Sequence, residues 1–511
     1  MSPRRITAIA VLSAAVAASA ALAALGTGSA SAGAEQRAQG AAAVPADALA
    51  YASVSLDRDG APLRSLEALA AKVDGGEAAV ARLDDMLDGS SRQGAVLRAL
   101  GGDVSVGLVG IDPTPLADGG RPQADAVLVA TAADGEALTA ALERAGFAAG
   151  PAIAGRPVWE KDAMAVSVQG TTAIAGTSRA TLAEAIAVQS GAKPALADDA
   201  AFTATIARLP GDAVAVAYLA PARLAGLVGA VAPLLSKGAA AKSAPDMADA
   251  LSRVARDLEG IRGLGIAVTA EAGGLRVIAA GDADQAALER LGARFPTAYA
   301  PAILAQIPAD AVGFAAFRDL GPTLSAALAA GERQDPQTKA LIASVEQTIG
   351  IDLAELAAAL GGEHAIYAVA GETPGAALIT RPQDPAKAAG VLVRALASAR
   401  KLAAAMPDQA GAAQAEPAIA VTRADGTVAV GTLPRAAFPP RASMADSAAL
   451  RTLVERAGMP AEVTGLAYLD GDALRAAMTA RGGPAPRGAD ALRGALAWGT
   501  ATGGVLYIPI G

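Results

Sequence analysis

The segment Pro210–Leu219, PGDAVAVAYL, recurs as Pro460–Leu469, PAEVTGLAYL, and this repeat indicates how the chain is organised. Each copy begins with turn-forming residues and continues as an apolar run with a tyrosine near its end, a pattern typical of a β-strand. A repeat at a long, fixed distance indicates that one structural unit occurs twice. The 511-residue chain is therefore predicted to contain two copies of one unit.

Four further matches occur in the same order along the chain. Their offsets vary only slightly, as small loop insertions in a duplicated chain would produce. Five ordered matches are hard to obtain from a composition rich in Ala and Gly. The four additional pairs are Pro45–Ala48 with Pro308–Ala311, Leu100–Asp103 with Leu360–Glu363, Val127–Asp134 with Ala377–Asp384, and Ala165–Thr177 with Ala420–Thr432.

Each copy mixes strand and helix patterns. Asp425-Gly426 and its counterpart Gln169-Gly170 favour tight turns between antiparallel strands. Asp134 and Asp384 stand where helix N-caps are expected. The expected fold class is α+β, with two pseudo-repeated halves, each an antiparallel sheet with Ala-rich helices packed on one face.

The N-terminus is typical of an export signal. Two arginines precede the apolar run Ile6–Leu25, and Ala30-Ser31-Ala32 matches a cleavage site that would release Gly33. The run is also long enough to cross a bilayer as a retained anchor, so both alternatives stay open. The expected organisation is an export signal over residues 1–32, a flexible tether over 33–43, and α+β repeats over 44–295 and 296–511.

This segment places the protein outside the cytoplasm, either secreted or tethered to the outer face of the cytoplasmic membrane. Membrane contact is expected only through the N-terminal segment, if it is not cleaved. Because both copies keep their strand order with short connections between them, we expect the halves to form a joint architecture.

Composition excludes several classes of chemistry. The chain has 42 Lys+Arg against 50 Asp+Glu, no Cys and a single His, His364. Thiol catalysis, disulfides, Cys/His zinc sites and any Ser-His-Asp triad away from His364 are therefore excluded. Scattered charge with an acidic excess argues against a nucleic-acid partner. Phosphate-binding and nucleophile-elbow motifs do not occur, so no cofactor is expected.

The remaining polar motifs have structural interpretations. His364 opens a strand, and its counterpart in the first copy is Val104, so the repeat does not require an imidazole there. Ser190–Lys193 matches S-x-x-K but lacks the companion K-T-G motif. Three aspartate pairs could offer oxygen ligands to a cation, yet they lack calcium-loop spacing and fit turns or caps better. They are Asp57 with Asp59, Asp282 with Asp284, and Asp470 with Asp472. We expect no catalytic residues and no metal site.

Four aromatic residues occupy corresponding strands of the two copies. They are Tyr51, Tyr218, Phe314 and Tyr468. They are candidates for lining a groove that holds an apolar ligand between sheet and helices. The alternative, which is more common for strand aromatics, is that they belong to the core.

The corner Pro45–Leu56, PADALAYASVSL, follows the export segment and carries a family resemblance. With Leu100–Asp103, Pro210–Leu219 and Ile307–Asp310, it resembles the exported, actinomycete-type bacterial family grouped as domain of unknown function 3352. The resemblance implies an exported or membrane-anchored protein. It implies no activity and no catalytic residues.

We therefore expect an exported, non-catalytic envelope protein whose partner is a lipid or other apolar ligand. The alternative is a structural or protein-interaction module without a ligand pocket, whose partner is an envelope protein. A third possibility, a hydrolase that uses carboxylates or Ser and Lys, would require two acidic groups to converge in one cleft.

Overall fold

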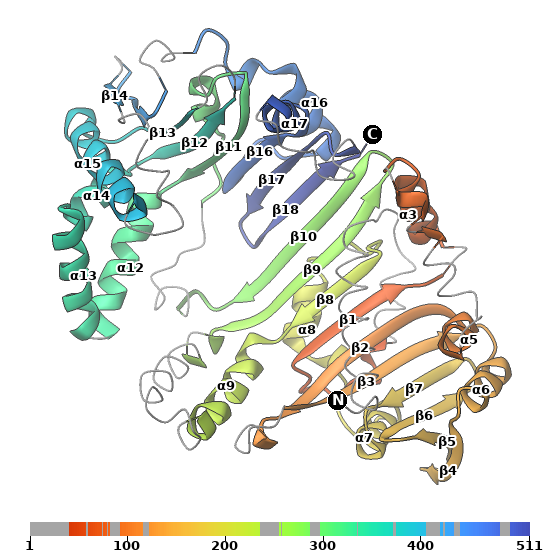
Figure 1. Cartoon of the computed structure of the whole chain (residues 1–511). Coiled ribbons are helices and arrows are strands. Elements are labelled where there is room, and N and C mark those ends of the chain that lie inside the picture. The colour runs from red at the N-terminus through yellow and green to blue at the C-terminus, as the bar shows by residue number, and fades with distance from the viewer. Residues whose placement is uncertain are drawn as a thin grey trace. The chain divides into compact units, whose positions relative to one another are not determined.

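The computed structural model divides into two compact units, Met1–Ala287 with Ile510–Gly511 (unit 1) and Leu288–Pro509 (unit 2) (Figure 1). The export signal expected over 1–32, most of the expected tether, and the expected boundary at 295/296 lie outside the described residues. The structure describes residues 40–57, 60–73, 75–78, 80–81, 92–115, 122–235, 255–256, 258–286, 297–334, 336–370, 375–404, 419–422, 425–433, 440–480 and 491–510.

The described strands of unit 1 form an antiparallel sheet in the order β4-β5-β6-β7-β3-β2-β1-β8-β9-β10. The β6–β7 turn contains Gly170 at φ +56°, a conformation that favours glycine. The strands are β1 (Ala50–Ser55), β2 (Leu100–Asp112), β3 (Gln123–Ala132), β4 (Ala148–Ile153), β5 (Arg156–Lys161), β6 (Met164–Gln169), β7 (Thr172–Gly176), β8 (Ala215–Leu219), β9 (Ile261–Glu271) and β10 (Gly274–Ala283).

In unit 1, α6 begins at the side-chain cap that the sequence indicated. The Asp134 carboxylate accepts a hydrogen bond from the Glu136 backbone amide at 2.9 Å, which confirms that cap. The helices are α3 (Ala61–Ala70), α5 (Arg92–Ala99), α6 (Gly135–Arg144), α7 (Arg179–Gln189), α8 (Ala200–Ile206) and α9 (Pro221–Leu235), with a short 3-10 turn η2 (Leu196–Asp198).

The described strands of unit 2 form an antiparallel sheet in the order β14-β15-β13-β12-β11-β16-β17-β18. They are β11 (Ala311–Arg318), β12 (Glu363–Val369), β13 (Gly375–Thr380), β14 (Ile419–Thr422), β15 (Val428–Gly431), β16 (Gly465–Asp470), β17 (Gly494–Thr500) and β18 (Gly503–Pro509). Both units therefore combine helices with antiparallel sheet, as the expected α+β class requires.

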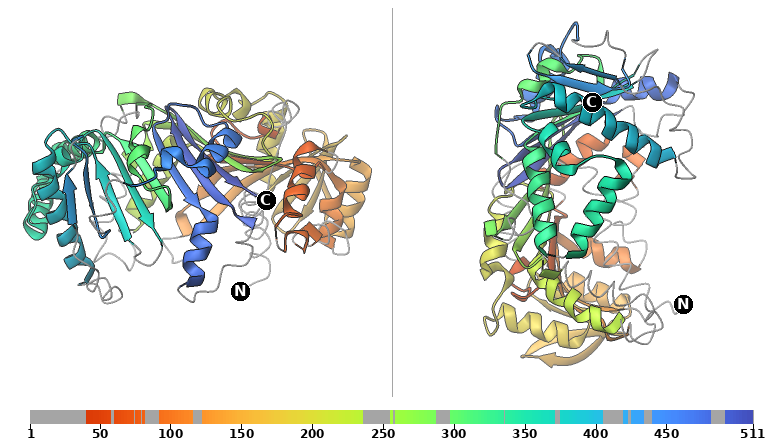
Figure 2. Two further views of the ribbon diagram at one scale, coloured as in Figure 1. Left: turned by 90° about the horizontal axis from the view of Figure 1, so that it is seen from above. Right: turned by 90° about the vertical axis from the view of Figure 1, so that its left-hand side faces the viewer.

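In unit 2, α12, α13, α14 and α15 pack on one another (Figures 1 and 2). The second predicted N-cap, Asp384, is also present: its carboxylate accepts a hydrogen bond from the Lys387 backbone amide at 3.0 Å. The helices are α12 (Leu320–Gln334), α13 (Pro336–Ile349), α14 (Leu353–Ala359), α15 (Pro385–Ala404), α16 (Ala448–Ala457) and α17 (Gly471–Ala480), with 3-10 turns η3 (Ala302–Gln306) and η6 (Met444–Asp446). Among the described residues, no helix combines the length and apolar character needed to span a bilayer.

Around β6 in unit 1 and β15 in unit 2, helices cover both faces of the sheet, so the expectation of helices on one face is wrong. In unit 1, Leu138 of α6 packs in one cluster with Val166, whereas Leu182 of α7 packs in another with Ala165. Neighbouring strand residues point to opposite faces, so α6 and α7 lie on opposite sides of β6. The physical reason is that β6 has apolar side chains on both of its faces, and each face is buried by packing against a helix.

Unit 2 has the same two-sided arrangement. Val428 and Val430 of β15 belong to a cluster with Val391 of α15, and the intervening Ala429 belongs to a cluster with Leu450 of α16. The strand ladder therefore separates two apolar layers in each unit.

Residues 40–43, the last part of the expected flexible tether, pack against unit 1. Ala41 and Ala43 are fully buried. Val44 covers Gly107 of β2 so closely that a Cβ at this glycine would lie 2.4 Å from the Val44 Cγ1 atom. Residues 40–43 therefore belong to the packed unit, because a glycine in the strand leaves room for this segment to lie against the sheet.

Candidate functional site

The structure brings the four candidate aromatics together in pairs, one pair in each unit. Tyr51 of β1 lies directly opposite Tyr218 of β8, and Phe314 of β11 lies directly opposite Tyr468 of β16. The exposed fraction of each of the four residues is 7% or less. They face the packed interior of their own unit.

In unit 1 the aromatic pair holds a third ring between its members. Phe202 of α8 meets Tyr51 edge-to-face with ring centroids 5.4 Å apart, and meets Tyr218 at 5.0 Å. Such edge-to-face pairs stabilise a core beyond the apolar area that they bury. In unit 2, Phe314 and Tyr468 contact one another at 5.7 Å.

The phenol groups of unit 1 have internal partners. The Tyr51 hydroxyl donates to Ser105 Oγ at 2.9 Å, and Ser105 Oγ in turn donates to Ser53 Oγ at 3.1 Å. The Tyr218 hydroxyl donates to the Arg262 carbonyl at 3.4 Å, and burial raises the pKa of Tyr218 to about 12. This burial and ring packing match the core alternative, while a ligand-binding role for the four aromatics stays a prediction.

The same strands present a different set of residues on their opposite face. In β9 the buried residues Gly263, Gly265 and Ala267 alternate with solvent-exposed residues. Among the exposed ones, Leu264 is 40% and Ile266 is 48% exposed. Leucine and isoleucine at exposed strand positions contrast with the polar residues expected there.

Strand register places these exposed residues in two rows across β2, β1, β8, β9 and β10. All ten positions are Ala, Val, Leu, Ile or Gly, and none of them is classed as buried. Five strands span about 24 Å. We call this set the open face of unit 1: Leu108, Ala50, Leu219, Leu264 and Gly281 in one row, and Val106, Ala52, Ala217, Ile266 and Ala279 in the other.

Unit 2 has a corresponding surface, which we call the open face of unit 2. It also carries no charged or hydrogen-bonding side chain, and Ile366 is 50% and Leu469 is 39% exposed. Its members are Ala368, Gly313, Leu469 and Ala495 in one row, and Ile366, Ala315, Ala467, Ala497 and Leu506 in the other.

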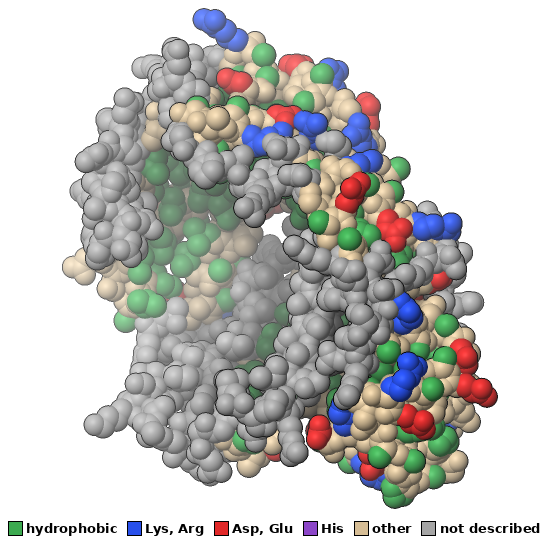
Figure 3. All heavy atoms as spheres, turned by 45° about the vertical axis from the view of Figure 1, so that its right-hand side comes forward, with side chains coloured by type: hydrophobic (Ala, Val, Ile, Leu, Met, Phe, Trp, Pro, Cys, Tyr) green, Lys and Arg blue, Asp and Glu red, His purple; other side chains and the backbone are tan. Residues whose placement is uncertain are grey.

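The space-filling view illustrates how apolar side chains gather. Figure 3 shows a field of hydrophobic side chains toward the left that contains hardly any charged residue, while basic and acidic side chains are spread over the upper and right-hand parts. Contiguous exposed apolar surface is uncommon on soluble proteins and marks a site for a ligand or partner. We therefore take the open faces as the candidate functional site.

Sequence reasoning missed this site because it followed the aromatics, which lie on the other face. A signal was present in Leu264–Ala270, LGIAVTA, where apolar residues occupy both alternating sets of strand positions. A strand covered on one side only would alternate with polar residues. Which of the two strand faces stays exposed depends on where the helices pack, and this cannot be predicted from the local sequence.

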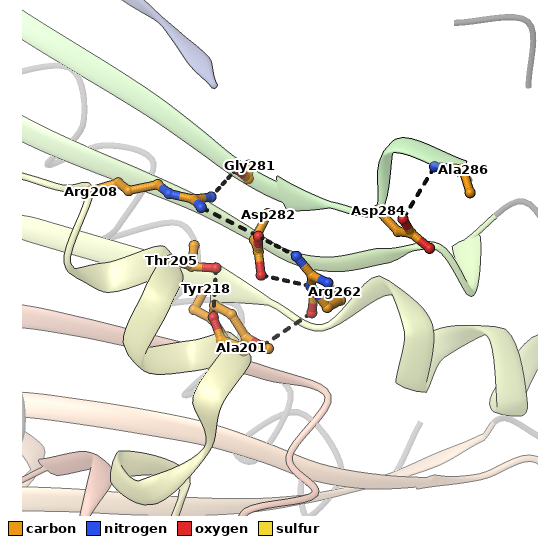
Figure 4. Close-up of polar contacts among 9 residues, drawn as sticks. All are labelled: Ala201, Thr205, Arg208, Tyr218, Arg262, Gly281, Asp282, Asp284 and Ala286. Atoms are coloured by element: carbon orange, nitrogen blue, oxygen red, sulfur yellow. Dashed lines mark hydrogen bonds and ion pairs between the residues drawn. The ribbon is translucent and has the colours of Figure 1, made fainter. Parts of the chain in front are cut away.

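A cluster of charged residues lies where β9 and β10 meet the C-terminal end of α8 (Figure 4). Arg262 donates through Nε and Nη2 to the two oxygens of Asp282, both at 2.9 Å, and Arg208 Nη2 lies 3.4 Å from the same carboxylate. The hydrogen bond from Arg262 is the largest cause that lowers the pKa of Asp282.

Aspartates that the sequence offered as possible cation ligands accept hydrogen bonds from backbone amides instead. Asp284 accepts from the Ala286 amide at 3.2 Å, and Asp470 accepts from the Ala473 amide at 2.9 Å. Asp59 lies outside the described residues. Within the described ranges, no three His, Asp or Glu side chains gather as a metal site would require.

The two remaining motifs do not converge on a reactive centre. His364 is fully buried, its Nδ1 atom lies 2.9 Å from Thr380 Oγ1, and burial lowers its pKa to about 4. The Ser190 hydroxyl donates to the Ala187 carbonyl at 2.9 Å. The Lys193 ammonium instead pairs with Glu184, and this hydrogen bond raises the Lys193 pKa.

Solved structures resemble the chain only weakly. Crystal form I of TP0453 gives a TM-score of 0.26 with 8% identity over 47% of this chain and 77% of that one. Crystal form IV of TP0453 gives 0.25 with 10% identity over 50% and 86%. A likeness at this level supports no conclusion about fold or function.

A comparison with curated proteins gives no match. A family model described as "Protein of unknown function (DUF3352)" matches residues 149–409, which run from unit 1 into unit 2. This match covers half of the chain and names the same family as the resemblance; it includes Pro210–Leu219 and Ile307–Asp310 but not Pro45–Leu56. The chain belongs to the DUF3352 family of proteins of unknown function.

Proposed function

We propose that this protein is an exported, non-catalytic envelope protein that binds the apolar chain of a lipid-like ligand on its open faces. The observation that carries the proposal is the row formed by Leu219 and Leu264, with Ile266 beside it; these three side chains are 36–48% exposed, and the open face as defined contains no charged side chain. Apolar surface of this kind gains free energy when a ligand removes it from water.

The expected affinity follows from the area that such a ligand buries. A chain lying on an open sheet loses water from one side, so we assign it about half of the ~0.8 kcal/mol per CH2 of full burial. About fourteen CH2 groups then contribute about 6 kcal/mol, which corresponds to a Kd of about 0.1 mM. Contacts with a headgroup would tighten this value.

We further propose that the two units are copies of one ancestral plan, so that each carries one ligand face. The strand order β6-β7-β3-β2-β1-β8-β9-β10 of unit 1 corresponds, position by position, to the whole sheet of unit 2, which supports duplication. Isolated bridges tie Pro45 to Ala195 and Pro308 to Ser443 at corresponding corners.

A further sequence match between the two units supports the same proposal. Leu196–Phe202, LADDAAF, corresponds to Met444–Leu450, MADSAAL. Each segment forms a 3-10 turn followed by a helix, and the capping side chains are Asp199 and Ser447. Phe202 and Leu450 then occupy corresponding places in the cores of the two units.

The first experiment is native mass spectrometry with lipid extraction on protein purified from its own envelope fraction. A stoichiometric apolar molecule is the expected result, and the intact mass reports whether residues 1–32 are removed. A ligand-free protein that instead carries a second protein would favour the interaction-module alternative.

A pair of variants tests whether the apolar ligand binds on the open face of unit 1. Leu264→Glu places a charge in the open face of unit 1, and Val345→Glu places the same charge on α13; both positions are 40% exposed. We expect Leu264→Glu to reduce binding of a fluorescent fatty acid while Val345→Glu leaves it unchanged. Equal binding by both variants would contradict the assignment to the open face.

A further inference from the structure

Resting on the proposed function, we infer that the ligand of each open face is a single extended acyl chain of about 16–20 carbons that lies across the strands. Its methyl end is placed at β2 in unit 1 and at β12 in unit 2. The boundaries of the open faces carry this inference. Each face is long across the strands and short along them, and helices close the same two sides in both units.

One side of the open face of unit 1 ends abruptly under a helix. On β9, Ile266 is 48% exposed, whereas Val268, two residues further on the same face of the strand, is 4% exposed. Ala215 of β8, directly opposite Val268, is 6% exposed. Helix α3 covers this row, because its buried leucines pack against Val54 of β1 and the helix contacts β9. A ligand on the open face therefore stops at α3.

The open face of unit 2 ends in the same way. On β12, Ile366 is 50% exposed, whereas His364, two residues earlier on the same face of the strand, is fully buried. Phe317 of β11 lies directly opposite His364 in this row. Helix α14 lies against the row, because Thr380, which contacts His364, donates its hydroxyl to the Ala359 carbonyl of that helix.

The ends of strands set the other side of each face. In unit 1, β1 begins at Ala50 and β8 ends at Leu219, and these two residues lie opposite one another. In unit 2, the pairing between β11 and β16 begins with Gly313 opposite Leu469. Each open face is therefore two residue rows deep, which corresponds to about 13 Å along the strands.

Helices also close one end of each face across the strands. Leu128 of β3 lies opposite Val106 and packs in a cluster with α6, while Leu378 of β13 lies opposite Ile366 and packs in a cluster with α15. The two leucines correspond in the repeat. A charged headgroup against them would lose water without gaining a partner, so the methyl end of the chain lies there.

These dimensions favour one orientation of the chain. Five strands span about 24 Å, compared with about 13 Å along the strands. An extended chain with C–C bonds of about 1.5 Å advances by about 1.25 Å per carbon, so about 19 carbons fit across the strands and about 10 fit along them. Each added CH2 group contacts more apolar surface, so a chain laid across the strands binds more tightly.

The test is a length series of straight-chain fatty acids from about 10 to about 24 carbons, kept below micelle formation. Each acid competes with a fluorescent fatty acid for the full-length protein. Half-burial of the chain predicts that Kd falls about twofold per added CH2 group. We expect this fall to continue to about 16–20 carbons and then to stop, because further CH2 groups lie beyond the five strands.

A double variant tests the position of the methyl end. Val106→Glu/Ile366→Glu places a charge on β2 and on β12, and this removes one strand from each face. We expect the length at which Kd stops falling to decrease by about four carbons, while the Kd of the shortest acid is unchanged. The control, Val345→Glu, places the same charge at a 40% exposed position of α13 and should leave the whole series unchanged.

The other outcomes have distinct meanings. A Kd that stops falling near about 10 carbons would show that the chain runs along the strands. A Kd that still falls at the longest acid would show that the five strands do not limit the chain. Either result overturns the inference and leaves the proposed function intact. An unshifted series in the double variant overturns the position of the methyl end. Failure of every acid to displace the fluorescent probe overturns the proposed function itself.

Discussion

Lowering the pH should destabilise unit 2 through His364, the one histidine of the chain. The imidazole is fully buried beside Phe317, with ring centroids 5.5 Å apart. Thr380 donates its hydroxyl to the Ala359 carbonyl at 3.3 Å, so its oxygen accepts from His364 Nδ1–H, and the ring is held in its neutral form.

The direction and the size of the stability change follow from the pKa of His364 in the unfolded and in the folded chain. Burial lowers the pKa of His364 from 6.5 to about 4 in the folded protein. Between these values the unfolded chain binds a proton that the folded chain does not, so folding stability falls as the pH is lowered through this window. The loss between pH 7.5 and pH 5 is about 2 kcal/mol.

The assay is urea unfolding at pH 7.5, 6 and 5, followed by fluorescence of the buried Trp498 of unit 2. The matched variant is His364→Val, because Val104 stands at this position of the first repeat. Carboxylates titrate alike in both proteins, so the difference in their pH dependence isolates the imidazole. We expect the unaltered protein to lose about 2 kcal/mol more than the variant.

The same pH dependence of the unfolding free energy in the unaltered protein and in His364→Val would refute this reasoning. So would an NMR titration in which the single imidazole of the folded protein changes its chemical shift near pH 6.5. Either result would mean that the ring exchanges protons with water in the folded state and that its burial does not hold it neutral.

Two packing predictions concern unit 1. Phe202→Ala removes the ring between Tyr51 and Tyr218 and should lower the free energy of unfolding by about 3–5 kcal/mol, measured by urea denaturation; a loss below about 1 kcal/mol would contradict the described core. Gly107→Ala places a Cβ against Val44 and should abolish hydrogen-exchange protection of residues 41–44, and unchanged protection would show that this segment is not seated on the strand.

Local pattern was sufficient for much of the secondary structure. The tight turn at Asp425-Gly426 falls between β14 and β15, with Gly426 at φ +79°. The capping aspartates Asp134 and Asp384 also behave as expected. Turns and caps depend on conformational preferences and hydrogen bonds within a few residues, so a sequence states them directly.

The open faces could not be recognised without the register of strands that are far apart in the chain. Leu219 and Leu264 are neighbours only because β8 pairs with β9, and Arg262 meets Asp282 only across the β9–β10 ladder. No local preference specifies which alternating set of strand residues the helices will cover, so the sequence could not separate the aromatic core from the open face.

The amino-acid sequence was enough to predict the mixed α and antiparallel β composition, to identify the family, and to exclude thiol and Cys/His zinc chemistry. These properties depend on residue identity and on contacts between near neighbours. Only the three-dimensional structure shows that helices cover both faces of part of each sheet, that Tyr51 and Tyr218 point inward, and that Leu264 and Ile266 are left exposed. These properties arise when distant strands align, because a side chain's exposure is set by what packs over it.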